Sequence, residues 1–179
     1  MSLFPIPEQL RDTLPAQARA FDFLQGAWLI HHRRLRARLV ASIEWDEFQT
    51  PFVMECMLGG LGNLDQCRRM PPAPFYEGVS LRLFDIAAGH WKIYWVDSST
   101  GQLCPPVTGT FHGALGTFTG TDTHAGQPVQ VRFLWDKTDP ARPTWQQAFS
   151  PDDGASWEVN WHMAFTRVAA TGGAYPRSC

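Results

Sequence analysis

The chain carries near its end the stretch Trp157-Glu-Val-Asn-Trp-His-Met-Ala-Phe-Thr-Arg167, which decides how the rest of the sequence is interpreted. Large apolar side chains alternate there with polar ones, the period of a β-strand that buries one face. The buried face is expected to carry Trp157, Val159, Trp161, Met163 and Phe165, and the other face Glu158, Asn160, His162 and Thr166. Such a strand needs an aromatic core to pack against.

The same alternation recurs upstream at Trp91, Ile93 and Trp95, and again in 129–135. From Gly26 onward, short runs rich in Val, Ile, Phe, Trp and Thr are separated by Gly, Pro and Asp, with no helical period. Ten strands are predicted, near 27–38, 40–48, 51–58, 75–85, 90–97, 106–112, 115–121, 128–136, 143–149 and 156–168.

Ten strands without covering helices must bury their apolar faces on one another, and closure into a barrel also removes the exposed edges. We therefore predict an all-β fold, a single closed antiparallel up-and-down β-barrel over residues 26–168, with a two-sheet sandwich as the alternative. Residues 1–25 are expected to form a short helical or irregular segment, with a helix that opens at Pro7. Residues 169–179 are expected to be a C-terminal tail.

The composition narrows the classes of partner. The 179 residues suffice for one domain with its own core. The formal net charge is only -2, which favours neither nucleic acid nor an anionic membrane as a partner. No apolar run approaches the about 18 residues of a membrane-spanning helix, and no secretory signal is visible. The four cysteines are scattered without a C-x-x-C pair, so we predict reduced thiols in a soluble, cytoplasmic protein.

The string Phe21-Asp-Phe-Leu-Gln-Gly-Ala-Trp28, with Arg167 at the end of the last strand, resembles the signature of the calycin superfamily, which includes lipocalins, fatty-acid-binding proteins and nitrobindin-like proteins. The resemblance implies that Trp28 and Arg167 pack together, cation over indole, and close one end of the barrel. It covers about residues 21 to 168 and implies a fold more than an activity. Further strings look like a bacterial calycin-like family of unknown function: Trp45-Asp-Glu-Phe48, Gly59-Gly-Leu-Gly-Asn63, Ser80-Leu-Arg-Leu-Phe-Asp85, Ile93-Tyr-Trp-Val-Asp97 and Trp145-Gln-Gln-Ala-Phe-Ser150.

The densest basic stretch is His31-His-Arg-Arg-Leu-Arg-Ala-Arg38. Strict alternation would turn His32, Arg34, Arg36 and Arg38 into the apolar interior, where four cations would cost far too much. We therefore expect a bulge or bend near 31–33. The cations are expected to be solvated or to line the barrel mouth rather than to bind nucleic acid.

Two long connections, 59–74 and 97–106, are expected between strands, and long loops in compact domains are often functional. The first contains Gly59-Gly-Leu-Gly-Asn-Leu-Asp65, which lacks the third glycine and the following helix of a dinucleotide-binding loop. Two interpretations remain open. Either the glycines only allow a sharp turn, or Asn63 and Asp65 sit over the barrel mouth and contact a ligand.

The six histidines have neither H-E-x-x-H spacing nor cysteine partners at zinc-site intervals, so no metal site is predicted. The resemblance to nitrobindin-like barrels raises haem as a possible cofactor, with His162 as its ligand. Alternation turns His162 outward, however, and a lone histidine without a surrounding pocket is a poor ligand signal. We therefore expect no cofactor, with haem kept as a minor alternative.

The favoured function is binding of a small hydrophobic or amphipathic molecule inside the barrel. The indole rings expected around the ligand are those of Trp91, Trp95, Trp135, Trp145 and Trp161. The polar groups expected to orient it belong to His32, Asn63, Asp65, Arg82, Asp97, Gln147 and Asn160.

Two other functions stay open. The first is an enzyme that uses the same cavity, with Asp97 or His32 as base and Arg34 or Arg82 steadying an anion, although no nucleophile motif appears. The second is an interaction protein with a fully packed lumen. A carboxylate or histidine deep in an apolar cavity, with a shifted pKa, would favour the enzyme. The oligomeric state, a homodimer included, is left open.

Overall fold

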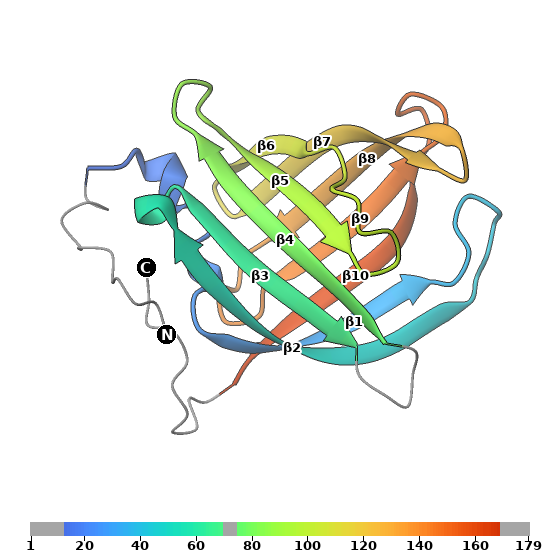
Figure 1. The fold of residues 1–179 in the computed structure, drawn as a ribbon, viewed down its shortest axis with the longest axis horizontal. Coiled ribbons are helices and arrows are strands. Elements are labelled where there is room, and N and C mark those ends of the chain that lie inside the picture. Colours follow the sequence, from blue (N-terminus) through green and yellow to red (C-terminus); the bar gives the residue numbers. More distant parts are fainter. Residues whose placement is uncertain (1–12, 70–74, 169–179) are drawn as a thin grey trace.

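The computed structural model describes residues 13–69 and 75–168, which form a closed barrel of ten antiparallel strands (Figure 1). Each strand pairs with its neighbours in sequence, and the first pairs with the last to close the ring. The strands are β1 (Ala27–Leu35), β2 (Trp45–Met57), β3 (Gly62–Arg69), β4 (Tyr76–Asp85), β5 (His90–Asp97), β6 (Val107–His112), β7 (Leu115–His124), β8 (Gln127–Asp136), β9 (Thr144–Ser150) and β10 (Glu158–Arg167). The predicted up-and-down barrel of ten strands is confirmed.

The two ends of the barrel differ. At the end where β1 begins and β10 finishes lie two short 3-10 turns, η1 (Ala16–Arg19) and η2 (Asp22–Leu24), at the left in Figure 1. We call this the closed end. The opposite end carries the β1–β2 connection, residues 36–44, and we call it the open end. The helix expected to open at Pro7 and the tail 169–179 lie outside the described residues.

Two predicted strand boundaries are wrong. The strands expected at 40–48 and 51–58 are one strand, β2, which runs unbroken through Pro51. Pro51 is tolerated because β2 pairs there with Leu29 of β1, whereas its ladder with β3 begins only at Met54. Half of the long loop expected at 59–74 is strand: after the turn η3 (Leu58–Gly60), β3 runs from Gly62 to Arg69, and residues 70–74 lie outside the described residues. Its inward residues are polar, so hydrophobic alternation gave no signal.

The bulge predicted near 31–33 is also wrong. β1 keeps continuous register with both of its neighbours from Trp28 to Arg34. The strand ends at Leu35, so Arg36 and Arg38 lie in the connection beyond it, and of the four basic residues only His32 and Arg34 are on the inward face of β1. The irregularity lies instead in β10, between Val159 and Trp161.

That bulge changes which side chains of β10 are buried. Asn160 and Trp161 are both buried although they are consecutive, so the prediction that Asn160 lies on the solvent face is wrong. Trp157 precedes the strand and lies under the guanidinium of Arg132, 4.2 Å from ring centroid to Cζ, instead of in the core.

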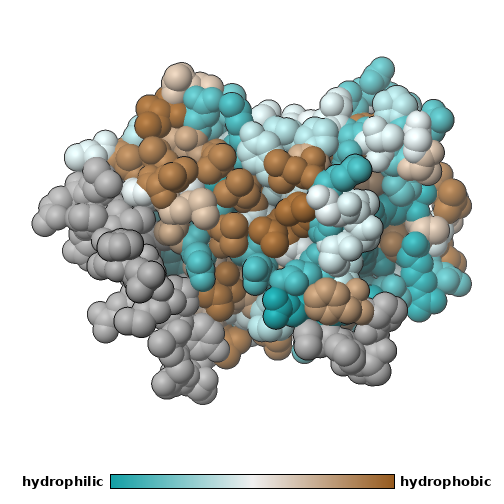
Figure 2. All heavy atoms as spheres, in the orientation of Figure 1, coloured by the Kyte–Doolittle hydropathy of each residue, from teal (hydrophilic) through white to brown (hydrophobic). Residues whose placement is uncertain are grey.

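The core is made largely of aromatic rings that point into the lumen, and it continues onto η1 and η2. Hydrophobic side chains also gather on the outer face, over β4 and β5 in Figure 2. None of the described helical turns is long and apolar enough to span a bilayer.

The cysteines correct another expectation. Cys67 is a buried free thiol and Cys104 a partly buried one, but Cys56 is disulfide-bonded. The prediction that all four thiols are reduced is therefore wrong at Cys56. Burial raises the pKa of Cys67 to about 11, which keeps this thiol protonated.

Candidate functional site

The closed end is sealed by the irregular segment 13–25, which we call the plug. Phe21 sits at its centre, with its ring centroid 5.0 Å from Trp91, 5.1 Å from Phe111 and 5.7 Å from Phe118. These rings come from β5, β6 and β7, so one side chain of the plug joins several strands. The contacts with Trp91 and Phe111 are T-shaped, and such pairs add stability beyond burial of area.

Barrel side chains hold the plug by its backbone carbonyls. Trp91 Nε1 donates to Gln17 O at 2.9 Å, Lys137 Nζ to Ala20 O at 2.8 Å, and Trp28 Nε1 to Leu24 O at 2.8 Å. These donors tie the backbone of the plug to the barrel, and Gln17 O also accepts from the Ala20 N–H at 3.2 Å.

Arg167 completes the seal. Its guanidinium donates to the carbonyl oxygens of Phe23 and Gln25 at 3.1 and 2.8 Å and lies 4.1 Å from the ring centroid of Trp28. Trp28 and Arg167 are also direct cross-strand partners in the pairing of β1 with β10. A cation on an indole face and two charge-assisted hydrogen bonds thus converge on one arginine.

Inside the barrel, above the plug, lies a cavity of about 90 Å³. Its walls are largely aromatic, and the rings meet edge to face: Trp161 lies 5.8 Å from Trp95 and 5.7 Å from Trp145, centroid to centroid. Trp95 can reach its place because residue 78 is glycine; a Cβ there would come within 2.1 Å of the indole. At the open end the lining includes Cys104, Pro105 and Asp122.

The structure brings seven of the twelve predicted ligand-binding residues to this cavity. They are Trp95, Trp135, Trp145, Trp161, Asp65, Arg82 and Gln147. Trp91 points inward but is buried in the contact with the plug. Three others do not line the cavity but hydrogen-bond to residues that do. Asn63 accepts from Arg82, Asn160 accepts from Gln147, and His32 accepts from Trp161. Asp97 lies at the rim of the open end.

Asn63 and Asp65 do not sit over the mouth as one interpretation had it, because both lie on β3 and face the interior. Arg82 Nη1 donates to Asn63 Oδ1 at 3.0 Å and pairs with Asp65. Burial raises the pKa of Asp65, and the charge of Arg82 opposes that rise. The two charges cancel within the cavity wall.

His32 is a neutral member of the core. Trp161 Nε1 donates to its Nδ1 at 3.2 Å, so the ring proton is on Nε2, 2.8 Å from Thr50 Oγ1. Burial, followed by the charges of His31 and Arg34, lowers the pKa of His32 to about 3. Both ring nitrogens are engaged, and Phe48 stacks on the imidazole at 4.5 Å.

At the open end, cations lie over aromatic faces. Arg34 Cζ is 4.5 Å from the ring centroid of Trp161 and 5.1 Å from that of Tyr76, and Arg38 Cζ is 5.5 Å from Phe149. Burial, then the charge of Arg34, lowers the pKa of Arg38 to about 10, so it stays protonated at neutral pH.

Asp97 receives hydrogen bonds at this rim from Tyr76 at 3.0 Å, from Trp95 at 3.1 Å and from Ser99. Desolvation alone would raise the pKa of Asp97, but these hydrogen bonds together outweigh it and lower that pKa. An ionised Asp97 is thereby fixed at the rim, and burial raises the pKa of Tyr76 to about 12.

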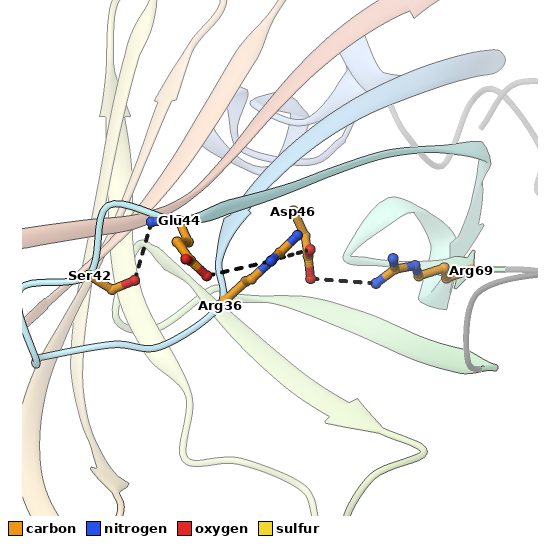
Figure 3. Close-up of polar contacts among 5 residues, drawn as sticks. All are labelled: Arg36, Ser42, Glu44, Asp46 and Arg69. Carbon is orange, nitrogen blue, oxygen red and sulfur yellow. Dashed lines mark hydrogen bonds and ion pairs between the residues drawn. The ribbon is translucent and has the colours of Figure 1, made fainter.

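The rest of the basic stretch points to solvent. Arg36 Nε lies 2.8 Å from Asp46 Oδ1, its Nη1 lies 3.5 Å from Glu44 Oε2, and Asp46 also faces Arg69 at 3.9 Å (Figure 3). Arg33 pairs with Glu47 at 3.0 Å. Acidic side chains on β2 and in the connection just before it thus pair with these arginines and balance their charge.

Across residues 13–69 and 75–168, no three His, Cys, Asp or Glu side chains lie close enough to hold a metal ion. His162 lies on the outer face, as alternation predicted, with its ring 5.5 Å from Trp45. It is therefore separated from the lumen by the sheet itself.

Sequence reasoning missed several lining residues. Ser80 and Asp122 are small or polar side chains at inward strand positions, where only the alternation itself could have pointed to them. Cys104 and Pro105 belong to the long connection 97–106. Its length indicated a functional loop but did not indicate which of its residues would line the cavity. Phe21 was visible only as part of the string that resembles the calycin signature.

No protein-family model matches the chain, and no curated protein matches it in sequence. Among solved structures, the barrel is similar to the crystal structure of Rv2717c from M. tuberculosis, with a TM-score of 0.58 and 11% sequence identity. The likeness covers 87% of this chain and 99% of that chain. At so low an identity it shows a shared fold alone.

Proposed function

We propose that the protein binds a small hydrophobic or amphipathic molecule inside the barrel, reached from the open end. The observation that carries the proposal is the cavity lined by the indole rings of Trp95, Trp135, Trp145 and Trp161 with a few polar groups among them. Concave, mostly apolar sites with a few oriented polar groups are typical of small-molecule binding.

The volume of the cavity limits the size of the ligand. At about 90 Å³ it is smaller than the roughly 150 Å³ of an engineered apolar cavity that accepts benzene in another protein. Drug-sized ligands occupy pockets of about 300 Å³ or more. These values support a ligand of about one small ring, and an extended acyl chain or a haem would require several core rings to move.

We further infer that the chain is a calycin-like protein. The meander that closes β1 onto β10, and the packing of Arg167 on Trp28 at the sealed end, agree with what the resemblance implies. The similar solved structure supports the fold without bearing on activity.

Binding is favoured over catalysis by the engagement of the candidate bases. His32 uses both ring nitrogens behind Trp161, and Asp97 is held at the rim by three donors. Asp65 reaches the cavity but is paired with Arg82. A general base needs a free lone pair within reach of its substrate.

The test is a titration of single-ring molecules followed by the indole N–H signals in two-dimensional ¹H–¹⁵N NMR spectra. Val131→Phe places a larger side chain in the cavity wall. Gln130→Phe is the control, because it introduces the same phenylalanine at the neighbouring, outward position of β8. We expect binding in the natural chain and in Gln130→Phe, with a loss of at least about tenfold in affinity in Val131→Phe.

Native mass spectrometry of freshly purified protein gives a second readout, a bound small molecule that Val131→Phe no longer carries. The proposal fails if no single-ring molecule perturbs the indole signals. It also fails if Val131→Phe, folded as judged by its spectrum, binds as well as the natural chain.

A further inference from the structure

We propose that the cavity selects a neutral molecule that carries a hydrogen-bond acceptor, and that Trp135 Nε1 and Arg82 Nε are the groups that receive it. This inference rests on the proposed function and names the class of ligand.

Two buried donors that lack an acceptor belong to residues lining the cavity. Among the described residues, Trp135 Nε1 and Arg82 Nε are both shielded from solvent and have no hydrogen-bond partner. The two residues are only 3% and 4% exposed, and both line the cavity. Other buried side-chain nitrogens among the described residues also lack a hydrogen-bond partner, but only these two belong to residues that line the cavity. Because a buried N–H without a partner is strongly disfavoured, such a pair at a cavity calls for an acceptor there.

The two donors belong to neighbouring groups whose positions are fixed. Arg82 Cζ lies 5.9 Å from the ring centroid of Trp135 and 5.2 Å from that of Phe21 in the plug. Nη1 of the same guanidinium is held by Asn63 and Asp65, so the plane that contains Nε cannot turn away. Both nitrogens are covered by neighbouring atoms, so an acceptor in the cavity reaches them only when the side chains around it move.

The charge of the site sets the charge of the ligand. Asp65 already cancels the positive charge of Arg82, and a second anion would face the Asp65 carboxylate in a low-dielectric interior. A neutral acceptor, such as a carbonyl oxygen or a ring nitrogen, satisfies a donor without that repulsion. The surrounding aromatic rings favour a flat, apolar body for the remainder of the molecule.

The experiment compares pyridine, benzene and pyrrole at slightly alkaline pH, where pyridine is neutral. Pyridine and benzene differ by one acceptor, and pyrrole offers an N–H donor in its place. We expect pyridine to bind about tenfold more tightly than either of the others, the effect of one hydrogen bond. We also expect it to move the Trp135 indole proton downfield, whereas benzene does not.

Trp135→Phe removes one of the two donors and should reduce the tenfold preference for pyridine over benzene. Trp157→Phe is the matched control, because that indole donates to Gly154 O outside the cavity and should leave the ratio unchanged. If Trp135→Phe does not fold, the test is the Trp135 indole proton in the natural chain, which should move downfield with pyridine and not with benzene. Equal binding of pyridine and benzene inside the barrel would overturn this inference and leave the proposed function intact. Failure of all three to bind would remove both.

Discussion

The closed and open ends of the barrel use the same pair of groups, an arginine and an aromatic ring, in different ways. At the closed end Arg167 lies on Trp28 and also binds two backbone carbonyls of the plug. At the open end Arg34 and Arg38 lie over ring faces, on the rim of the lumen. The first arrangement fixes a segment of chain in place. The second covers an opening with long side chains that can swing aside.

The comparison indicates that the closed end stabilises the fold, whereas the open end controls access to the cavity. Plug residues are joined to strands all round the ring, so their loss should weaken the whole barrel. Rim residues cover a cavity that already has its walls, so their loss should change the exchange of a ligand more than the fold. The predictions below test this division, beginning with the largest expected effect.

Phe21→Ala should destabilise the protein by about 3–5 kcal/mol, because it removes the ring on which the plug centres and leaves a cavity among Trp91, Phe111 and Phe118. The measurement is urea unfolding followed by tryptophan fluorescence. Phe75→Ala, at a ring that is 57% exposed, is the control and should change the free energy of unfolding by less than about 0.5 kcal/mol. Similar losses in the two variants would contradict the role given to the plug.

Acidification should destabilise the barrel through His32. Its pKa is lowered from 6.5 to about 3 on folding, so between these values the unfolded chain binds a proton that the native chain does not. The free energy of unfolding should therefore fall as pH falls, by up to about 1.4 kcal/mol per pH unit from this residue. From pH 6.5, where the unfolded-state histidine is half protonated, to pH 5 that amounts to about 1.6 kcal/mol.

His32→Gln tests this sign. Glutamine can accept from Trp161 and donate to Thr50 but does not titrate. Unfolding curves at a series of pH values should show a shallower acid slope in the variant than in the natural chain. An unchanged slope between pH 6.5 and pH 5 would mean that other groups control the acid sensitivity.

Arg167→Ala should destabilise the barrel by about 1–2 kcal/mol, since two hydrogen bonds to the plug and a cation–π contact are lost together. Arg36→Ala, at the exposed ion pairs of Figure 3, is the matched arginine and should cost about 0–1 kcal/mol. Thermal unfolding at two salt concentrations separates them, because only the Arg36 effect should shrink with added salt. A larger loss of stability in Arg36→Ala than in Arg167→Ala would contradict the role given to Arg167 at the closed end.

Arg38→Ala should have the smallest effect on stability, less than about 1 kcal/mol, because Arg38 lies in the β1–β2 connection and packs on the ring of Phe149 at the rim. Its effect should appear in kinetics: a single-ring ligand should enter and leave a few times faster, with little change in affinity. NMR exchange measurements on a bound ligand give these rates. A large loss of affinity with unchanged rates would place Arg38 in the binding site itself.

The sequence predicts the barrel well because alternation of large rings is a strong signal on β5, β8 and most of β10. It fails where inward residues are polar, since Asn63, Asp65 and Cys67 alternate on β3 without any hydrophobic period. It also fails at Asn160, because a bulge shifts the phase and no residue type marks it. Pro51 misleads for a related reason: whether a proline breaks a strand depends on which side of the ladder is paired.

The candidate site divides in the same way. Indole rings at inward positions could be named in advance, and four of the five line the cavity. The pairing of Arg82 with Asp65, and the position of His32 behind Trp161, depend on contacts between strands that are distant in sequence. Alternation along a strand predicts which face of the sheet a side chain lies on, but it does not predict which side chain of another strand it contacts.

The most direct test of the central claim is the crystal structure of the protein under xenon pressure, because xenon marks apolar cavities without needing any polar group. We predict a xenon atom inside the barrel, bounded by Trp95, Trp145 and Trp161. A barrel interior without xenon, its rings packed against one another, would contradict the binding function proposed for this protein.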